Sequence, residues 1–101
     1  MYVTCKDREE ALELSRALVE EKLAACANIF DGMTSVYVWE GKTCEDAEVV
    51  VLLKTLDDKR ERAIARIIEL HSYDVPCVTV WPIEGGNPAY LKWVTDSLGS
   101  A

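Results

Sequence analysis

His71 is the only histidine of the chain, and Cys77 follows it within the stretch ELHSYDVPCV. A cysteine and a histidine can act as nucleophile and base when the imidazole reaches the thiol and nearby donors stabilise the oxyanion. The sequence contains no motif that supplies such donors, and a cysteine inside PCVTVW is more simply a small buried hydrophobic residue. We therefore rank catalysis by this pair below the other interpretations of the stretch.

The same histidine could ligate a metal ion, because imidazole and thiolate together suit copper or zinc. The four cysteines are scattered and include no C-x-x-C pair, so a closed site needs ligands brought together by the fold or by two subunits. The alternative is a packing role, because a histidine at a helix C-terminus complements the carbonyl dipoles there. From the residues alone, both interpretations stay open.

Aromatic residues form a third candidate set. Trp39 precedes the Glu40-Gly-Lys turn of a predicted hairpin, Trp81 ends a predicted strand, and Tyr90 lies in a predicted helix. A tryptophan at the far end of a hairpin has little to pack against in a monomer of 101 residues. Because exposed aromatic surface often marks an interface, we expect Trp39 to lie at one rather than flat on its own sheet.

The composition predicts one globular domain over residues 1–101, with 50% hydrophobic and 29% charged residues. The net charge of −7 argues against a nucleic-acid partner, because phosphate-binding surfaces need clustered lysine and arginine. No stretch approaches the ~20 apolar residues of a membrane span. The N-terminal MYVTCKDREE becomes charged too early for a secretory signal. We therefore expect a cytoplasmic protein without a membrane partner, in which the cysteines are reduced thiols.

Hydrophobic periodicity and capping residues predict the elements that must position these side chains. In chain order they are a strand over 2–5, a helix over 8–22, extended segments over 26–30 and 33–42, a strand over 47–55, a helix over 57–71, a strand over 77–81 and a helix over 88–98. Asp7 and Glu10 form a capping box at the start of the first helix. The apolar run AEVVVLLKT predicts a central strand buried on both faces.

The order β-α-β-β-α-β followed by α is that of the ferredoxin-like α+β sandwich, an antiparallel sheet with helices on one face. This fold hosts many unrelated functions, so the function has to be argued from sites.

Five collinear blocks cover nearly the whole chain: VEEKLAACANI, TSVYVWEGK, EVVVLLKT, LHSYDVP and PIEGGNPAYLKWV. Together they resemble the CutA divalent-cation tolerance family. The resemblance implies a ferredoxin-like subunit in a tight homotrimer, whose long hairpins wrap around neighbouring subunits. It further implies a protein that binds copper or another divalent ion, needs no obligatory cofactor and is not an enzyme.

Individual residues carry the resemblance unevenly. His71 falls on the histidine of the family pattern H-x-Y-x-V-P, and Cys26 falls on the cysteine of L-A-A-C. Some copper-binding members add a cysteine in the first strand, at the position of Val3, and a second histidine at the position of Leu70. Cys5 lies two residues after Val3, and a shift of two keeps the same face of a strand. Cys5 is therefore a candidate substitute ligand.

Cys77 departs from the family pattern, which has glutamate directly after this proline. A thiolate in place of a carboxylate favours softer ions such as Cu(I). Among the cysteines, Cys77 is the one we expect least to be a ligand.

The leading hypothesis is a trimeric protein of divalent-metal homeostasis, with His71, Cys26 and Cys5 as metal ligands. The rival is a signalling or scaffolding trimer that binds a small ligand or protein partner in clefts between subunits, where any metal binding is adventitious. The predicted cleft and interface residues are Trp39, Glu40, Lys54, Tyr73, Trp81 and Tyr90.

Overall fold

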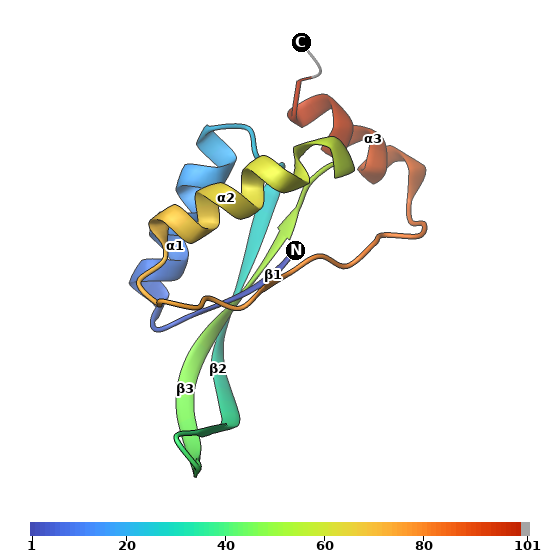
Figure 1. Cartoon of the computed structure of the whole chain (residues 1–101). Coiled ribbons are helices and arrows are strands. Elements are labelled where there is room, and N and C mark those ends of the chain that lie inside the picture. The colour runs from blue at the N-terminus through green and yellow to red at the C-terminus, as the bar shows by residue number, and fades with distance from the viewer. Residues whose placement is uncertain (100–101) are drawn as a thin grey trace.

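The computed structural model describes residues 1–99, which form one four-stranded antiparallel sheet and three helices (Figure 1). The strands are β1 (Tyr2–Cys5), β2 (Cys26–Trp39), β3 (Lys42–Lys54) and β4 (Val78–Thr79), in the spatial order β2-β3-β1-β4. The helices are α1 (Arg8–Glu20), α2 (Arg60–Leu70) and α3 (Pro88–Ser97), with a 3-10 turn η1 (Asp57–Lys59) before α2. The α+β class and the antiparallel sheet predicted from the sequence are confirmed.

The helices α1 and α2 lie side by side over one face of the sheet (Figure 1). The core between them is apolar, and Leu14, Val51 and Ile67 are among its fully or almost fully buried side chains. Burying a side chain of this size contributes about 1.5–3 kcal/mol relative to leaving it in water. This layer therefore supplies much of the stability that fixes the ends of the helices.

The central strand β3 is buried on one face only, which corrects the prediction of burial on both faces. Val49, Val51 and Leu53 point into the core, whereas Val50 and Leu52 alternate with them and are only partly buried. The opposite face of the sheet carries no helix in the described chain (Figure 1). The apolar side chains of β3 on this second face are thus not covered by α1 or α2.

The two extended segments predicted over 26–30 and 33–42 form one long strand, β2, with an irregularity between Phe30 and Met33. Gly32 there has φ +83°, a conformation that glycine adopts without a steric penalty. Beyond it, β2 and β3 continue as a two-stranded hairpin that projects from the body (Figure 1). We call residues 33–48 the hairpin arm.

The strand predicted over 77–81 is shorter, because β4 pairs with β1 only through Tyr2↔Thr79 and Val3↔Val78. The chain leaves the sheet at Val80, where β1 has already reached its first residues, and Pro82 has no N–H to donate. No helix among residues 1–99 is long and apolar enough to cross a membrane.

Substitution of Ile67 by alanine tests the core. Ile67 is fully buried, whereas its neighbour Ile68 is 52% exposed. We expect Ile67→Ala to lower the free energy of unfolding by about 2–5 kcal/mol, because it removes buried methyl groups and leaves a cavity. Ile68→Ala is the matched control and should change stability by less than about 1 kcal/mol. Guanidinium unfolding of both variants measures the difference, and equal losses would contradict this assignment of the core.

Candidate functional site

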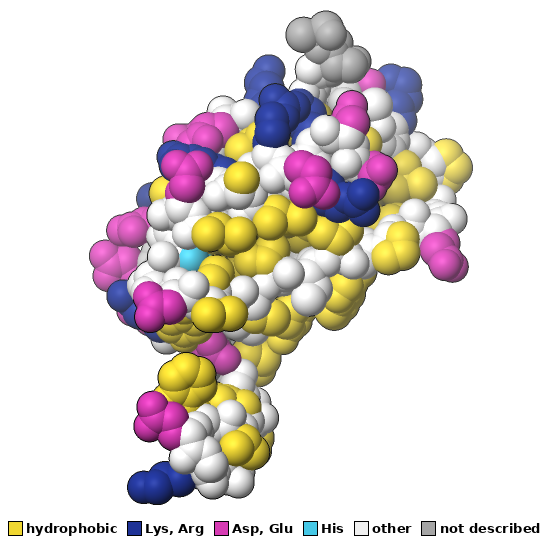
Figure 2. Space-filling model, viewed as in Figure 1, with side chains coloured by type: hydrophobic (Ala, Val, Ile, Leu, Met, Phe, Trp, Pro, Cys, Tyr) yellow, Lys and Arg dark blue, Asp and Glu magenta, His cyan; other side chains and the backbone are white. Residues whose placement is uncertain are grey.

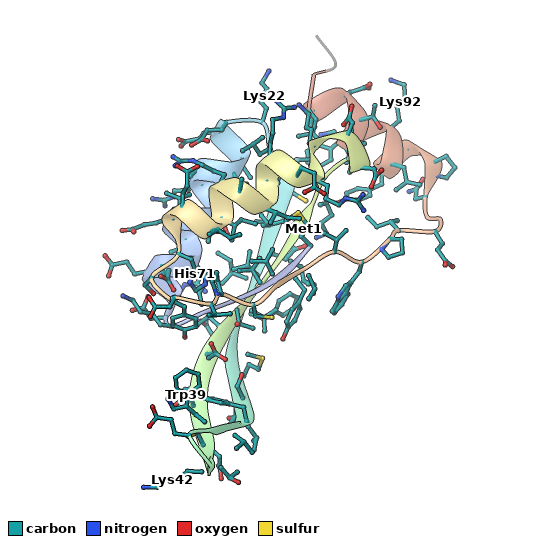
Figure 3. The ribbon with its side chains drawn as sticks, in the orientation of Figure 1. Met1, Lys22, Trp39, Lys42, His71 and Lys92 are labelled. Atoms are coloured by element: carbon teal, nitrogen blue, oxygen red, sulfur yellow. The ribbon has the colours of Figure 1, made fainter. Side chains whose placement is uncertain are left out.

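Three potential metal ligands meet where β1 ends, α1 begins and α2 ends. A sulfur of Cys5, a carboxylate oxygen of Glu10 and a ring nitrogen of His71 all lie within 4.8 Å of one another. All three residues are buried. Among residues 1–99 this is the one group of three such ligands so arranged. Figure 3 shows His71 at the end of α2 that lies over the start of α1. We call these residues the three-ligand cluster.

The ends of the three elements place these side chains. Cys5 is the last residue of β1, and Asp7 caps α1 by accepting a hydrogen bond of 2.8 Å from the Glu10 N–H. His71 is the residue at which α2 stops, since its backbone is extended (φ −76°, ψ 142°). Half of the predicted capping box forms, because Asp7 caps α1 but the Glu10 carboxylate accepts from the Lys6 N–H instead of the Asp7 N–H. The start of α1 and the predicted helix end near His71 thus lie together.

Both ring nitrogens of His71 are engaged. Tyr73 donates its backbone N–H to Nδ1 at 3.1 Å, and Nε2 lies 2.7 Å from the carbonyl oxygen of Thr4. A backbone N–H can only donate and a carbonyl can only accept, so Nδ1 carries the lone pair and Nε2 carries the proton. In this state His71 is a neutral imidazole that ties the end of α2 to β1.

Both carboxylate oxygens of Glu10 also accept hydrogen bonds. Its Oε1 accepts from the Lys6 N–H and its Oε2 from the Ser72 N–H, each at 3.0 Å. Burial alone would raise the pKa of this carboxyl, but the hydrogen bonds from Ser72 and Lys6 outweigh it, so its pKa is lowered. The side chain is thus an anion at neutral pH, able to bind a cation.

The pKa of Cys5 is shifted upward, whereas that of Glu10 is lowered. Burial, followed by the negative charges of Glu10, Glu48 and Asp7, raises the pKa of its thiol to about 12. The thiol is therefore protonated at neutral pH, and a metal ion would bind it with release of that proton.

The donor set suits a divalent metal ion of intermediate softness. Thiolate, imidazole and carboxylate are the ligands of zinc, and thiolate with imidazole also suits copper. With bonds of about 2.3 Å to sulfur and 2.0 Å to nitrogen, adjacent tetrahedral ligands lie about 3.5 Å apart. The cluster spans 4.8 Å, so its donors need to approach by about one ångström. Small rotations of these side chains can provide that movement.

Cys26, also predicted as a ligand, lies outside the three-ligand cluster of its own chain. Cys26 is opposite Lys54 on β3, whereas Cys5 is opposite Val49. Five residues of strand separate these positions along β3, a distance of about 17 Å. The Cys26 sulfur instead lies 3.3 Å from the hydroxyl of Tyr90. Cys77 is exposed and lies outside the cluster.

Glu10 was missing from the sequence-based set of ligands. Its position in a capping box explains it fully as a helix-start residue, so its type and spacing gave no reason to connect it with His71. Only the topology, which brings the start of α1 beside the end of α2, reveals the second role.

The predicted cleft residues do not line one cleft within a single chain. Lys54 and Trp81 border a largely apolar groove of about 590 Å³ between β3, the chain after β4, and α3. Tyr73 lies beside the three-ligand cluster, where its hydroxyl donates to Glu48. Trp39 is at the end of the hairpin arm, 64% exposed. Figure 2 shows hydrophobic side chains both on the body below α2 and on the arm.

The other two members of that set are also dispersed. Glu40 stands in the turn at the tip of the arm with φ +50°, a left-handed conformation. Tyr90 lies on α3 and stacks on Trp93 with 5.8 Å between ring centroids. A shared cleft built from these residues would need more than one subunit.

The sequence and the fold were compared with known proteins. The profile of the family described as CutA1 divalent ion tolerance protein matches residues 1–97. A protein of Xenopus laevis named Protein CutA homolog is 46% identical over 95 residues, which cover 94% of this chain and 63% of that protein. The divalent-cation tolerance protein CutA of Thermus thermophilus is 41% identical over 99 residues, which cover 98% and 96%. The crystal structure of CutA1 from Oryza sativa superposes with a TM-score of 0.95 at 41% identity, covering 99% of this chain and 92% of that one.

Relatives also overturn the prediction of a cytoplasmic location. The structure of a periplasmic divalent cation tolerance protein CutA from Archaeoglobus fulgidus is 36% identical, with a TM-score of 0.93 over 97% of this chain and 95% of that one. A chloroplastic Protein CutA from Arabidopsis thaliana is 43% identical, and this chain spans 53% of its length. The same fold is thus found in proteins assigned to different compartments. The charge of the N-terminal residues therefore does not locate the protein.

Alkylation of the cysteines tests the environment of Cys5. With a pKa of about 12, the Cys5 thiol is ionised to about one part in ten thousand at pH 8, so iodoacetamide should modify it at least about 100-fold more slowly than the exposed Cys77. Because the pKa is raised, the Cys5 rate should keep climbing with pH above 9 instead of levelling off. Peptide mass spectrometry measures both rates, and a Cys5 rate that levels off near pH 9 would contradict the assignment.

Proposed function

The chain belongs to the CutA1 divalent ion tolerance protein family, and we propose that it binds copper or another divalent ion at Cys5, Glu10 and His71. The observation that carries the proposal is the convergence of three buried donors of different chemistry within 4.8 Å. Two of the three, Cys5 and His71, are residues that the sequence had marked as ligands. The third, Glu10, adds the negative charge that a divalent cation requires.

The chemistry of the site favours ions late in the first transition series. Affinity of such donor sets generally rises toward copper, and a thiolate strengthens the preference for copper and zinc over magnesium or calcium. Loss of the Cys5 proton on binding leaves two anionic ligands and one neutral ligand around a doubly charged ion. A protein with such a site lowers the concentration of free metal ions by holding them.

We also propose that the single domain is a ferredoxin-like sandwich that assembles into a homotrimer. The strand order β2-β3-β1-β4 supports the fold, and the resemblance to the family supports the trimer. The hairpin arm adds a physical reason, because Val36, Val38 and Trp39 on it are each more than 60% exposed. Contiguous exposed apolar surface of this kind is typical of an interface.

A second candidate function is ligand binding by a signalling or scaffolding trimer. The apolar groove beside Lys54 and Trp81 favours it, because sites for small molecules are concave, mostly apolar and of this size. The two functions differ in one measurement: a metal affinity no tighter than that of free histidine or cysteine would favour the ligand-binding trimer.

Calorimetric titration tests the metal site. We expect Zn(II), and Cu(II) under anaerobic conditions, to bind the wild-type protein with release of about one proton from Cys5, so that affinity rises with pH. Cys5→Ala and His71→Ala should each weaken binding at least about 100-fold, because a ligand is lost and even the loss of a residue that only orients a ligand costs about 10–100-fold. Cys26→Ala is the matched control and should bind like the wild type. Unchanged affinity in the first two variants would refute the site.

Light scattering tests the assembly. A trimer of the 11.3 kDa chain should give a mass of about 34 kDa at micromolar concentration. Trp39→Glu should shift the population toward smaller species, because it places a charge in the proposed interface. Val75→Glu is the control, since Val75 is 87% exposed but lies outside the arm. A mass of 11.3 kDa for the wild-type protein would exclude the trimer.

A further inference from the structure

A continuous path of hydrogen bonds leads from the three-ligand cluster to the hairpin arm. The backbone N–H of Tyr73 donates to His71 Nδ1, and the hydroxyl of the same residue donates to Glu48 Oε2 at 2.9 Å. The other carboxylate oxygen of Glu48 accepts from the hydroxyl of Ser35. Glu48 on β3 pairs with Met33 on β2, at the base of the arm. Tyr73 is thus bonded to a candidate ligand through its backbone and to the arm through its side chain.

Metal ligation by His71 cannot leave this path intact. Ligation through Nδ1 uses the lone pair that now accepts the Tyr73 N–H. Ligation through Nε2 requires the ring proton to move to Nδ1, and two N–H groups then face each other. In either case the hydrogen bond from the Tyr73 backbone is lost. Glu10 is under no such constraint, since each carboxylate oxygen has a second lone pair free for a cation.

From this geometry we propose that the metal site and the hairpin arm are coupled through Tyr73, so that ligation by His71 loosens the base of the arm. The inference rests on the proposed function, because it needs an ion at the cluster. Once its backbone is released, Tyr73 keeps its hydroxyl bond to Glu48 and the packing of its ring on that of His71, with 4.7 Å between ring centroids. Because ligation also moves the His71 ring, we expect the contact to Glu48 to weaken. The arm carries the surface proposed for assembly, so metal occupancy would act on subunit contacts.

Linkage makes the coupling reciprocal. If ion binding works against the contact between Tyr73 and Glu48, then removing that contact must favour ion binding by the same factor. Tyr73→Phe removes only the hydroxyl and retains the backbone N–H, the ring and all three ligands. Tyr37→Phe is a matched control, because the Tyr37 hydroxyl also bonds a carboxylate on the arm, that of Asp46, but does not touch the cluster.

Hydrogen exchange measured by mass spectrometry on the assembled protein, with and without saturating Zn(II), tests the coupling. We expect Zn(II) to speed exchange about threefold or more in residues 71–76 and in the hairpin arm, while exchange in α1 stays unchanged. In Tyr73→Phe, exchange in the arm should be fast before Zn(II) is added and should not respond to it. The same variant should bind Zn(II) several-fold more tightly by calorimetry, and Tyr37→Phe should respond to Zn(II) as the wild type does.

The outcomes separate the two proposals. Cys5-dependent Zn(II) binding with unchanged exchange in the arm, or with equal affinity in wild type and Tyr73→Phe, would overturn the coupling and leave the metal site standing. A Zn(II) response lost equally in Tyr37→Phe and Tyr73→Phe would also overturn it, because the effect would then not pass specifically through Tyr73. Absence of Zn(II) binding to the wild-type protein would overturn both proposals.

Discussion

The buried carboxylate of Glu10 is the constraint on which the site depends. It holds two backbone N–H groups, that of Lys6 before α1 and that of Ser72 after α2, and so ties the start of one helix to the end of the other. A buried anion is costly unless such bonds compensate it, and hydrogen bonds to a charged group contribute about 1.5–3 kcal/mol each. Without Glu10, the backbone N–H groups of Lys6 and Ser72 would lose these acceptors. The bond from Ser72 to Glu10 holds the residue next to His71, and His71 itself bonds the Thr4 carbonyl of β1 through Nε2.

The same arrangement brings the three donors close together while each of them remains engaged within the protein. Every polar atom that could ligate an ion through Glu10 or His71 already has a partner in the protein, and the Cys5 thiol holds its proton. Ligation by His71 would therefore displace a structural hydrogen bond, which would lower the affinity for the ion and link occupancy to conformation. In a tolerance protein this compromise is reasonable, because a site that holds ions only when they are abundant leaves the essential supply untouched.

The fold was predictable from the sequence because its elements are marked locally. Asp7 and Asn87 accept hydrogen bonds as helix caps, as their positions before apolar periodic segments predicted. Strand lengths were less predictable, since β4 ends where β1 has no further residue to pair with it, a non-local limit. Of the residues that the sequence marked as ligands, Cys5 and His71 meet in the three-ligand cluster, whereas the register of β2 on β3 places Cys26 about 17 Å from Cys5 along the strand of the same chain. Resemblance to a family ranks residues by type and cannot measure such separations.

Within residues 1–99 the sheet is covered by helices on one face only, and this one-sided burial is the physical argument for the proposed assembly. Helices α1 and α2 cover one face, and the other face presents partly buried positions such as Val50 and Leu52, which are continuous with the arm through the ladder of β2 and β3. A long two-stranded hairpin is marginally stable in water by itself. Within its own chain the arm is supported at its base by the bond between Tyr73 and Glu48, and the proposed trimer would add contacts with other subunits at its tip. Because Tyr73 also donates its backbone N–H to His71, the proposed ligation by that imidazole would act on the base of the arm through one residue.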